Sequence, residues 1–228
     1  MPKSNRYRLI TFDVYTALFD IEGSLTPILR ETLGAGIDSP GFVRAWRGKQ
    51  LEYALISNSL RQGRVSFGVI TRRALDDTLA RAALDLPEPS RASLVEAWQD
   101  LRPWPEAALV LATLKARGYS LSLLSNGDTA MLRALLTKLP AVIDQVFSSQ
   151  QAGFYKPHPS IYALPLQSLA LDASELLHVA GSPTDVLGAK AAGISCAWSN
   201  RQRQPALDRD RPADYEMSDL SQLLEILE

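Results

Sequence analysis

Short apolar runs alternate with longer segments of helical periodicity along most of this 228-residue chain. Three runs end in small or polar residues: RLITFDV at 8–14, SLSLLSN at 120–126 and LLHVAGS at 176–182. Two shorter runs, QVFS at 145–148 and ISCAWSN at 194–200, are expected to add strands. Strands that alternate with helices of 10 to 15 residues are typical of crossover units. The pattern predicts an α/β fold around a parallel sheet.

The segment from about residue 21 to residue 101 is different, because its apolar spacing is helical throughout. We expect helices over about 26–33, 41–60, 66–84 and 90–101. Along the second, six residues recur at helical spacing: Phe42, Trp46, Leu51, Ala54, Leu55 and Asn58. Such a face needs a packing partner. We therefore predict a helical insert over residues 21–101 and an α/β core formed by residues 1–20 and 102–228.

Composition narrows the class of protein. The chain is 46% hydrophobic and 21% charged, as in ordinary soluble domains, and its net charge of −1 favours neither a nucleic-acid nor a membrane-surface partner. The opening MPKSNRYRLITF lacks the apolar segment of a signal peptide, and no stretch is long enough to span a membrane. Cys196 is the only cysteine, which excludes an intrachain disulfide. We expect a cytoplasmic protein.

Polar residues stand where the predicted strands end, and ligands of open parallel sheets bind at these ends. Asp13 ends the first strand, and Asp185 follows the third. Ser125 and Asn126 end the second and would offer a hydroxyl, an amide and backbone N–H groups near a helix start, which suits an anion. Each of these residues is equally explained, taken alone, as a helix cap or turn residue.

Lys156 lies in FYKPHPSIY, where prolines restrict the loop. A lysine held near Asp13 would keep that carboxylate ionised as a nucleophile, although a lysine in such a loop is more often a surface residue. The chain has two histidines, His158 and His178. Neither has a serine or cysteine partner at motif spacing, so a charge-relay hydrolase is not predicted and both are assigned structural roles.

Taken in order, these motifs resemble the haloacid dehalogenase (HAD) superfamily across essentially the whole chain. The resemblance implies a Rossmann-like core and identifies the insert as the superfamily's helical cap. The phosphatases of the superfamily carry a second acid two residues after the nucleophile, where Tyr15 stands here. They also bind magnesium through an acid that in this chain would lie four or five residues before Asp185, where Gly181 and Ala180 stand. Both differences disfavour phosphate transfer.

The pattern is more similar to the L-2-haloacid dehalogenases (type II), which use no metal. WRGKQLEY at 46–53 matches a stretch of these enzymes, which implies that Arg47 holds the departing halide. The resemblance implies that Asp13 attacks the substrate's α-carbon and that water near Lys156 and Asp185 hydrolyses the resulting ester. Catalytic roles are thus implied for Asp13, Lys156, Asp185 and Arg47. Substrate contacts are implied for Tyr15, Arg47, Ser125, Asn126, Tyr162 and Ser182.

Two motifs depart from this family. The usual Asp-x-Tyr-Gly-Thr ends here in Thr16 and Ala17, and the usual Ser-Ser-Asn before the last acid is replaced by Ala180, Gly181 and Ser182. Ester hydrolysis depends on the placement of water at the second of these motifs, so it is the step that the departures affect most. The sequence therefore leaves open a metal-independent hydrolase of 2-haloalkanoic or other 2-substituted acids, a phosphatase that needs Mg²⁺, and a non-catalytic binding protein. The expected partner is a small anion, with a homodimer possible and no cofactor unless the phosphatase alternative holds.

Overall fold

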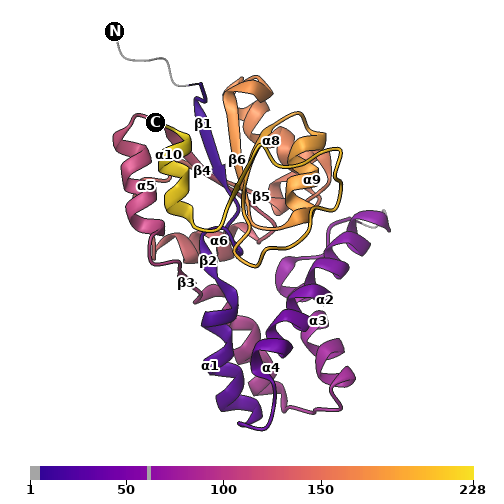
Figure 1. Cartoon of the computed structure of the whole chain (residues 1–228). Coiled ribbons are helices and arrows are strands. Elements are labelled where there is room, and N and C mark those ends of the chain that lie inside the picture. Colours follow the sequence, from indigo (N-terminus) through magenta and orange to yellow (C-terminus); the bar gives the residue numbers. More distant parts are fainter. Residues whose placement is uncertain (1–5, 61–62) are drawn as a thin grey trace.

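The computed structural model describes residues 6–60 and 63–228, so residues 1–5 of the predicted core and residues 61–62 of the predicted insert lie outside it. Its centre is a six-stranded parallel sheet in the order β5-β4-β1-β6-β7-β8 (Figure 1). The strands are β1 Leu9–Phe12, β4 Ser120–Ser125, β5 Gln145–Ser148, β6 Leu176–Ala180, β7 Ser195–Ser199 and β8 Tyr215–Met217. The predicted α/β class is confirmed, and β8 is a strand that the sequence pattern did not predict.

Helices cover both faces of the sheet, which explains why the central strands β1, β4 and β6 are buried along nearly their whole length. The core helices are α5 Ala107–Ala116, α6 Thr129–Leu136, α7 Ser149–Ala152, α8 Pro159–Leu169, α9 Pro183–Ala191 and α10 Leu223–Ile226. One buried cluster joins the sheet to α5, α6 and α10, and a second joins it to α8 and α9. In Figure 1, α5 and α10 lie on one side of the sheet and α8 and α9 on the other. No helix of the described residues is long and apolar enough to cross a membrane.

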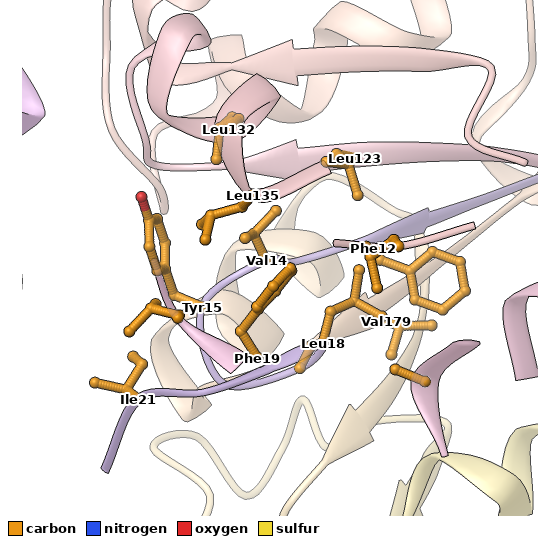
Figure 2. Packing of buried hydrophobic residues seen from close by; sticks show 14 of the residues in the cluster. Phe12, Val14, Tyr15, Leu18, Phe19, Ile21, Leu123, Leu132, Leu135 and Val179 are labelled. Atoms are coloured by element: carbon orange, nitrogen blue, oxygen red, sulfur yellow. The ribbon is translucent and has the colours of Figure 1, made fainter. Parts of the chain in front are cut away.

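The chain that follows β1 is anchored in the first of these clusters. Figure 2 shows side chains from this segment gathered against β4, β6 and α6. The labelled residues, all buried, are Phe12, Val14, Tyr15, Leu18, Phe19, Ile21, Leu123, Leu132, Leu135 and Val179. Since Asp13 lies within this run, its backbone is held by apolar packing on both sides.

The insert is helical, as predicted, and follows the first strand. Its elements are α1 Ile21–Leu33, α2 Ser39–Ser59, α3 Phe67–Arg81, α4 Glu88–Glu96 and the 3₁₀ helix η1 Ala97–Gln99. The chain leaves the core through β2 (Phe19–Asp20) and returns through β3 (Arg102–Pro103), and the two pair antiparallel. In Figure 1 these helices form a separate layer beyond the ends of the central strands.

The apolar face predicted on α2 has two destinations. Trp46 is fully buried and its indole N–H donates to the Thr71 carbonyl oxygen at 2.8 Å. Further along the helix, Leu51 and Leu55 line a chamber between the insert and the core, and Leu55 is 42% exposed. Asn58, counted as part of the same face, instead bonds to the backbone of Tyr155 in the core. The α2 helix therefore packs inside the insert with one half and faces the core with the other.

Candidate active site

The ends of three neighbouring strands meet the α2 helix around a small chamber. The chamber has a volume of about 20 Å³, room for about one water molecule. It is lined by Asp13, Arg47, Leu51, Leu55, Asn126, Lys156, Ser182, Thr184 and Asp185. Six of these residues were named from the sequence as candidate site residues, and they come from distant parts of the chain.

Asp13 is a buried carboxylate with one oxygen anchored. Its residue is 6% exposed, and Oδ1 accepts hydrogen bonds from Ser125 Oγ at 2.9 Å and from Lys156 Nζ at 3.3 Å. Burial raises the pKa of Asp13, and the neighbouring charges of Lys156 and Arg47 partly oppose that rise. No hydrogen bond from the described residues reaches Oδ2. The second oxygen is thus available to attack an electrophile.

Lys156 stands between the two acids of the site. Its ammonium nitrogen is 3.3 Å from Asp13 Oδ1 and 2.8 Å from Asp185 Oδ2, and the residue is 5% exposed. Asn126 fixes the loop that carries it, because Asn126 Oδ1 accepts from the Lys156 backbone N–H at 2.7 Å. The alternative of a surface lysine is therefore wrong. A cation between two buried carboxylates reduces the cost of burying both.

Asp185 is held on both of its oxygens. Oδ1 accepts from the Tyr162 hydroxyl at 2.8 Å, and Oδ2 accepts from Lys156 and lies 3.0 Å from His178 Nε2. Burial alone would raise the pKa of Asp185, but His178 and Lys156 hold it well below its ordinary value. Ser182, and not Asp185, is the N-cap of α9, since its hydroxyl oxygen accepts from the Asp185 backbone N–H at 3.3 Å. Asp185 thus faces the site as a fixed carboxylate.

Arg47 brings a positive charge to the chamber from the insert. Its guanidinium carbon lies 5.4 Å from the centre of the Tyr15 ring and 5.8 Å from that of Trp98. Its side chain also donates to the side-chain oxygen of Gln50. Tyr15 is fully buried beneath Arg47 and is not among the chamber's lining residues, and its hydroxyl has no hydrogen-bond partner among the residues that the structure describes. The guanidinium is therefore oriented by aromatic faces on one side and open to the chamber on the other.

Two of the positions that depart from the haloacid dehalogenase pattern, Thr16 and Gly181, contact each other. Thr16 has a φ of 75° and donates from Oγ1 to the Gly181 carbonyl oxygen at 2.7 Å. A Cβ atom at residue 181 would lie 2.4 Å from the same Oγ1. The Thr16 hydroxyl thus joins the loops after β1 and β6.

His178 is a site residue that the sequence interpretation missed, and Thr184, which lines the chamber, is another. His178 was assigned a structural role, but its Nε2 atom lies 3.2 Å from Lys156 Nζ and 3.0 Å from Asp185 Oδ2. The available signal was a polar residue inside an otherwise apolar strand, and polarity alone does not show which way such a residue points. His158, by contrast, caps α8 by accepting from the Ser160 backbone N–H at 3.2 Å. The structural assignment fits His158, whereas His178 contacts two residues of the site.

Among the residues that line the chamber, the carboxylates of Asp13 and Asp185 are the groups that could hold a metal ion. In the part of the chain that the structure describes, no group of three or more His, Cys, Asp and Glu side chains is spaced to do so. The Lys156 ammonium lies between Asp13 and Asp185, where it contacts both acids. The arrangement supports attack by a carboxylate on a small anion held near Arg47, followed by water chemistry near Asp185.

Known proteins are similar to this chain in sequence and in fold. A family model described as haloacid dehalogenase-like hydrolase matches residues 7–193. Haloacetate dehalogenase H-2 of Moraxella sp. (strain B) is 34% identical over 194 residues, covering 84% of this chain and 85% of that protein. The (S)-2-haloacid dehalogenase of Pseudomonas sp. (strain YL) is 32% identical over 96% of this chain and 94% of its own length.

Solved structures agree with these relatives. The L-2-haloacid dehalogenase of Xanthobacter autotrophicus with chloropropionic acid covalently bound matches with a TM-score of 0.86 at 28% identity, covering 96% of this chain and 98% of that chain. The L-2-haloacid dehalogenase RSc1362 matches with a TM-score of 0.91 at 27% identity over 97% and 98% of the two chains. Fold, sequence and motif order agree, and the chain belongs to the haloacid dehalogenase-like hydrolases.

Proposed function

We propose that the protein hydrolyses short (S)-2-haloalkanoic acids to 2-hydroxy acids through an ester on Asp13. The observation that carries the proposal is the Asp13 carboxylate, buried with Oδ2 unbonded, in one chamber with Lys156 and Arg47. The names of the relatives support the same substrate class, since they are haloacetate and (S)-2-haloacid dehalogenases.

In the first half-reaction, Asp13 Oδ2 attacks the substrate's α-carbon. The carbon–halogen bond breaks, and the halide leaves with the bonding electrons toward Arg47, which lines the chamber from α2. Asn126 and Ser182 line the same chamber and are assigned to the substrate's carboxylate. Ser125 orients the nucleophile, because its hydroxyl donates to Asp13 Oδ1. Halide needs no proton, so no general acid is required.

In the second half-reaction, water attacks the Asp13 carbonyl carbon and breaks the ester. The hydroxyl of water stays on Asp13, the 2-hydroxy acid leaves with its α-oxygen, and a proton is released. Asp185 and Lys156 orient the water, and Tyr162 holds Asp185 in place through the bond to Oδ1. A covalent intermediate divides one difficult displacement into two easier steps.

We propose that this reaction needs no metal, in line with the sequence resemblance. The support is the position of Lys156 Nζ, 3.3 Å from Asp13 Oδ1 and 2.8 Å from Asp185 Oδ2. A divalent ion that bridged the two acids would compete with this ammonium.

The test is halide release from each enantiomer of 2-chloropropionate in the presence of a chelator, with Asp13→Asn as the matched control. We expect release from the (S)-enantiomer alone and none from the control. Turnover in H₂¹⁸O would then place the label in the Asp13 peptide, detectable by mass spectrometry. Absence of halide release from both enantiomers, or phosphate release from phosphate esters that requires magnesium, would contradict the proposal.

We further propose that residues 21–101 act as a cap that encloses the substrate, supported by the three α2 residues that line the chamber: Arg47, Leu51 and Leu55. A homodimer is supported by apolar side chains exposed on the insert, Ile56 at 40%, Leu60 at 58% and Val69 at 44%. Sedimentation equilibrium of the wild type beside Leu60→Glu tests the dimer. A cytoplasmic location stays a prediction.

A further inference from the structure

His178 lies at the centre of the buried site although its strand is apolar on either side. It is 0% exposed, on β6, directly opposite Thr11 of β1 in the parallel register. Its Nδ1 atom is 2.9 Å from Thr11 Oγ1, and its ring meets the Tyr162 ring edge-on with centroids 6.0 Å apart. Both ring nitrogens therefore have partners, and neither partner is solvent.

The partners of Nε2 restrict the tautomer. Asp185 Oδ2 lies at 3.0 Å and Lys156 Nζ at 3.2 Å. A carboxylate only accepts hydrogen bonds and an ammonium only donates them, so one neutral Nε2 serves one of the two. Lys156 already has acceptors on Asp13 and Asp185, and the carboxylate is the closer partner. This favours a proton on Nε2 donated to Asp185, with Nδ1 accepting from the Thr11 hydroxyl.

We infer that His178 is a positioning residue for ester hydrolysis, acting through Asp185; this inference rests on the proposed function. The loop before Asp185 gives the carboxylate little support, because Ala180 and Gly181 have no polar side chain and Ser182 caps the helix. Three donors from the core hold it instead: Tyr162, Lys156 and His178. His178 thus supplies from the sheet a constraint that the loop lacks.

Loss of the His178 side chain is therefore expected to affect one half-reaction, the hydrolysis of the ester. Formation of the ester depends on Asp13, its neighbours and Arg47, and His178 makes no hydrogen bond to Asp13. Hydrolysis depends on the direction in which Asp185 holds water. Loss of a hydrogen bond to a charged group is expected to slow hydrolysis by about tenfold to a hundredfold. Ester formation should change by less than about threefold, and the ester should accumulate.

The experiment uses the full chain with (S)-2-chloropropionate in rapid mixing. The halide burst reports ester formation, and the mass of the quenched protein reports the ester. The variants are His178→Phe, which removes the donor, and His178→Gln, which places an amide N–H near the position of Nε2. A third variant, Thr11→Val, keeps the shape of residue 11 and removes its hydroxyl. Urea unfolding of each variant controls for stability.

We expect the His178→Phe protein to keep the burst and accumulate ester, and His178→Gln to recover most of the hydrolysis rate. Thr11→Val should give a smaller loss in the same step. Normal hydrolysis in His178→Phe would overturn the inference, as would equal losses in both steps without rescue by glutamine. Failure of the wild type to form any ester would instead reject the proposed function.

A measurement that needs no turnover tests the tautomer directly. The chain has two histidines, so ¹⁵N imidazole spectra of the wild type and of His178→Gln identify the His178 signals by difference. We expect a protonated Nε2 and an unprotonated Nδ1, and a change of tautomer population in Thr11→Val. A proton found on Nδ1 with Nε2 bare in the wild type would overturn the inference even if the variants were slow.

Discussion

Removing the side chain of Asn58 tests how the insert is fixed to the catalytic loop. Asn58 Nδ2 donates to the Tyr155 carbonyl oxygen at 2.8 Å, and Asn58 Oδ1 accepts from the Tyr155 backbone N–H at 2.8 Å. Tyr155 is fully buried, and its hydroxyl donates to the Val65 carbonyl oxygen at 2.6 Å. The next residue is Lys156. This reciprocal pair therefore holds α2 against the loop that carries the ammonium.

The magnitude follows from what each backbone group loses in Asn58→Ala. The Tyr155 N–H is left without a partner, which costs roughly 1–3 kcal/mol when the group is buried. The Tyr155 carbonyl keeps a second donor, the His158 backbone N–H at 2.9 Å, so its loss is smaller, about 0.5–1.5 kcal/mol. Asn58 is half-buried, and water can replace part of what is lost. We expect a net destabilisation of about 2 kcal/mol.

The assay is urea unfolding at neutral pH with linear extrapolation to water. Ser59→Ala is the matched control, since Ser59 is exposed and its hydroxyl donates only within α2, to the Leu55 carbonyl oxygen at 3.0 Å. We expect the control to change stability by less than about 0.5 kcal/mol. If Asn58→Ala unfolds at the wild-type midpoint, or the two variants lose the same stability, the pair does not hold the insert to the core.

Three more outcomes are expected. Gly181→Ser should lower the free energy of unfolding by about 1–3 kcal/mol, because the new Cβ would lie 2.4 Å from Thr16 Oγ1 and 2.7 Å from the backbone of the loop after β1. Adding Thr16→Gly to this variant should restore only part of the lost stability, and a urea midpoint equal to that of the wild type would contradict the reasoning. Burial raises the pKa of Asp13 in the folded protein. A group with a raised pKa contributes its full stability at pH values below its pKa in the unfolded chain, and this stability is lost as the pH rises through its pKa in the folded protein. Asp13→Asn should therefore melt above the wild type at neutral pH and lose that advantage near pH 4, a trend that melting curves across pH would test. Arg47→Lys keeps the charge but loses the guanidinium that lies over the Tyr15 and Trp98 rings. Halide release should fall at least about tenfold, and full activity would refute the role.

Most of the fold could be predicted from the sequence because the central strands are buried on both faces. The predicted strand at 145–148 matches β5, and the helical insert was recognised from its periodicity. The predicted start of the first insert helix was wrong: α1 begins at Ile21, capped by Asp20, and not near Thr26. Pro27 lies inside the helix and has no N–H for the Gly23 carbonyl, and the Arg102 guanidinium donates to that oxygen instead. A donor so distant in sequence leaves no local signal.

The candidate site was predictable to the extent that strand ends converge. Asp13, Asn126 and Asp185 follow strands that neighbour one another in the sheet, so parallel topology alone brings them to one edge. The contacts of His178 depend on the register of β6 with β1 and on a lysine from another loop. The burial of Tyr15 beneath Arg47 depends on how the insert folds back. Neither is encoded in local sequence.

The departures from the family motifs fall into two groups: Thr16 and Gly181 contact each other, whereas the change at Ala17 is separate. A threonine with positive φ costs about 1–2 kcal/mol relative to glycine, and Thr16 recovers part through its bond to the Gly181 carbonyl. That bond fits only because residue 181 has no Cβ, and the same Cβ would lie 2.7 Å from the backbone of Tyr15 and Ala17, so glycine at 181 is needed by the whole loop. Ala17 remains the separate loss of a hydroxyl near the nucleophile. Since Ser125 and Lys156 still bind Asp13 Oδ1, the carboxylate stays anchored, and the change falls on loop packing more than on the attacking group.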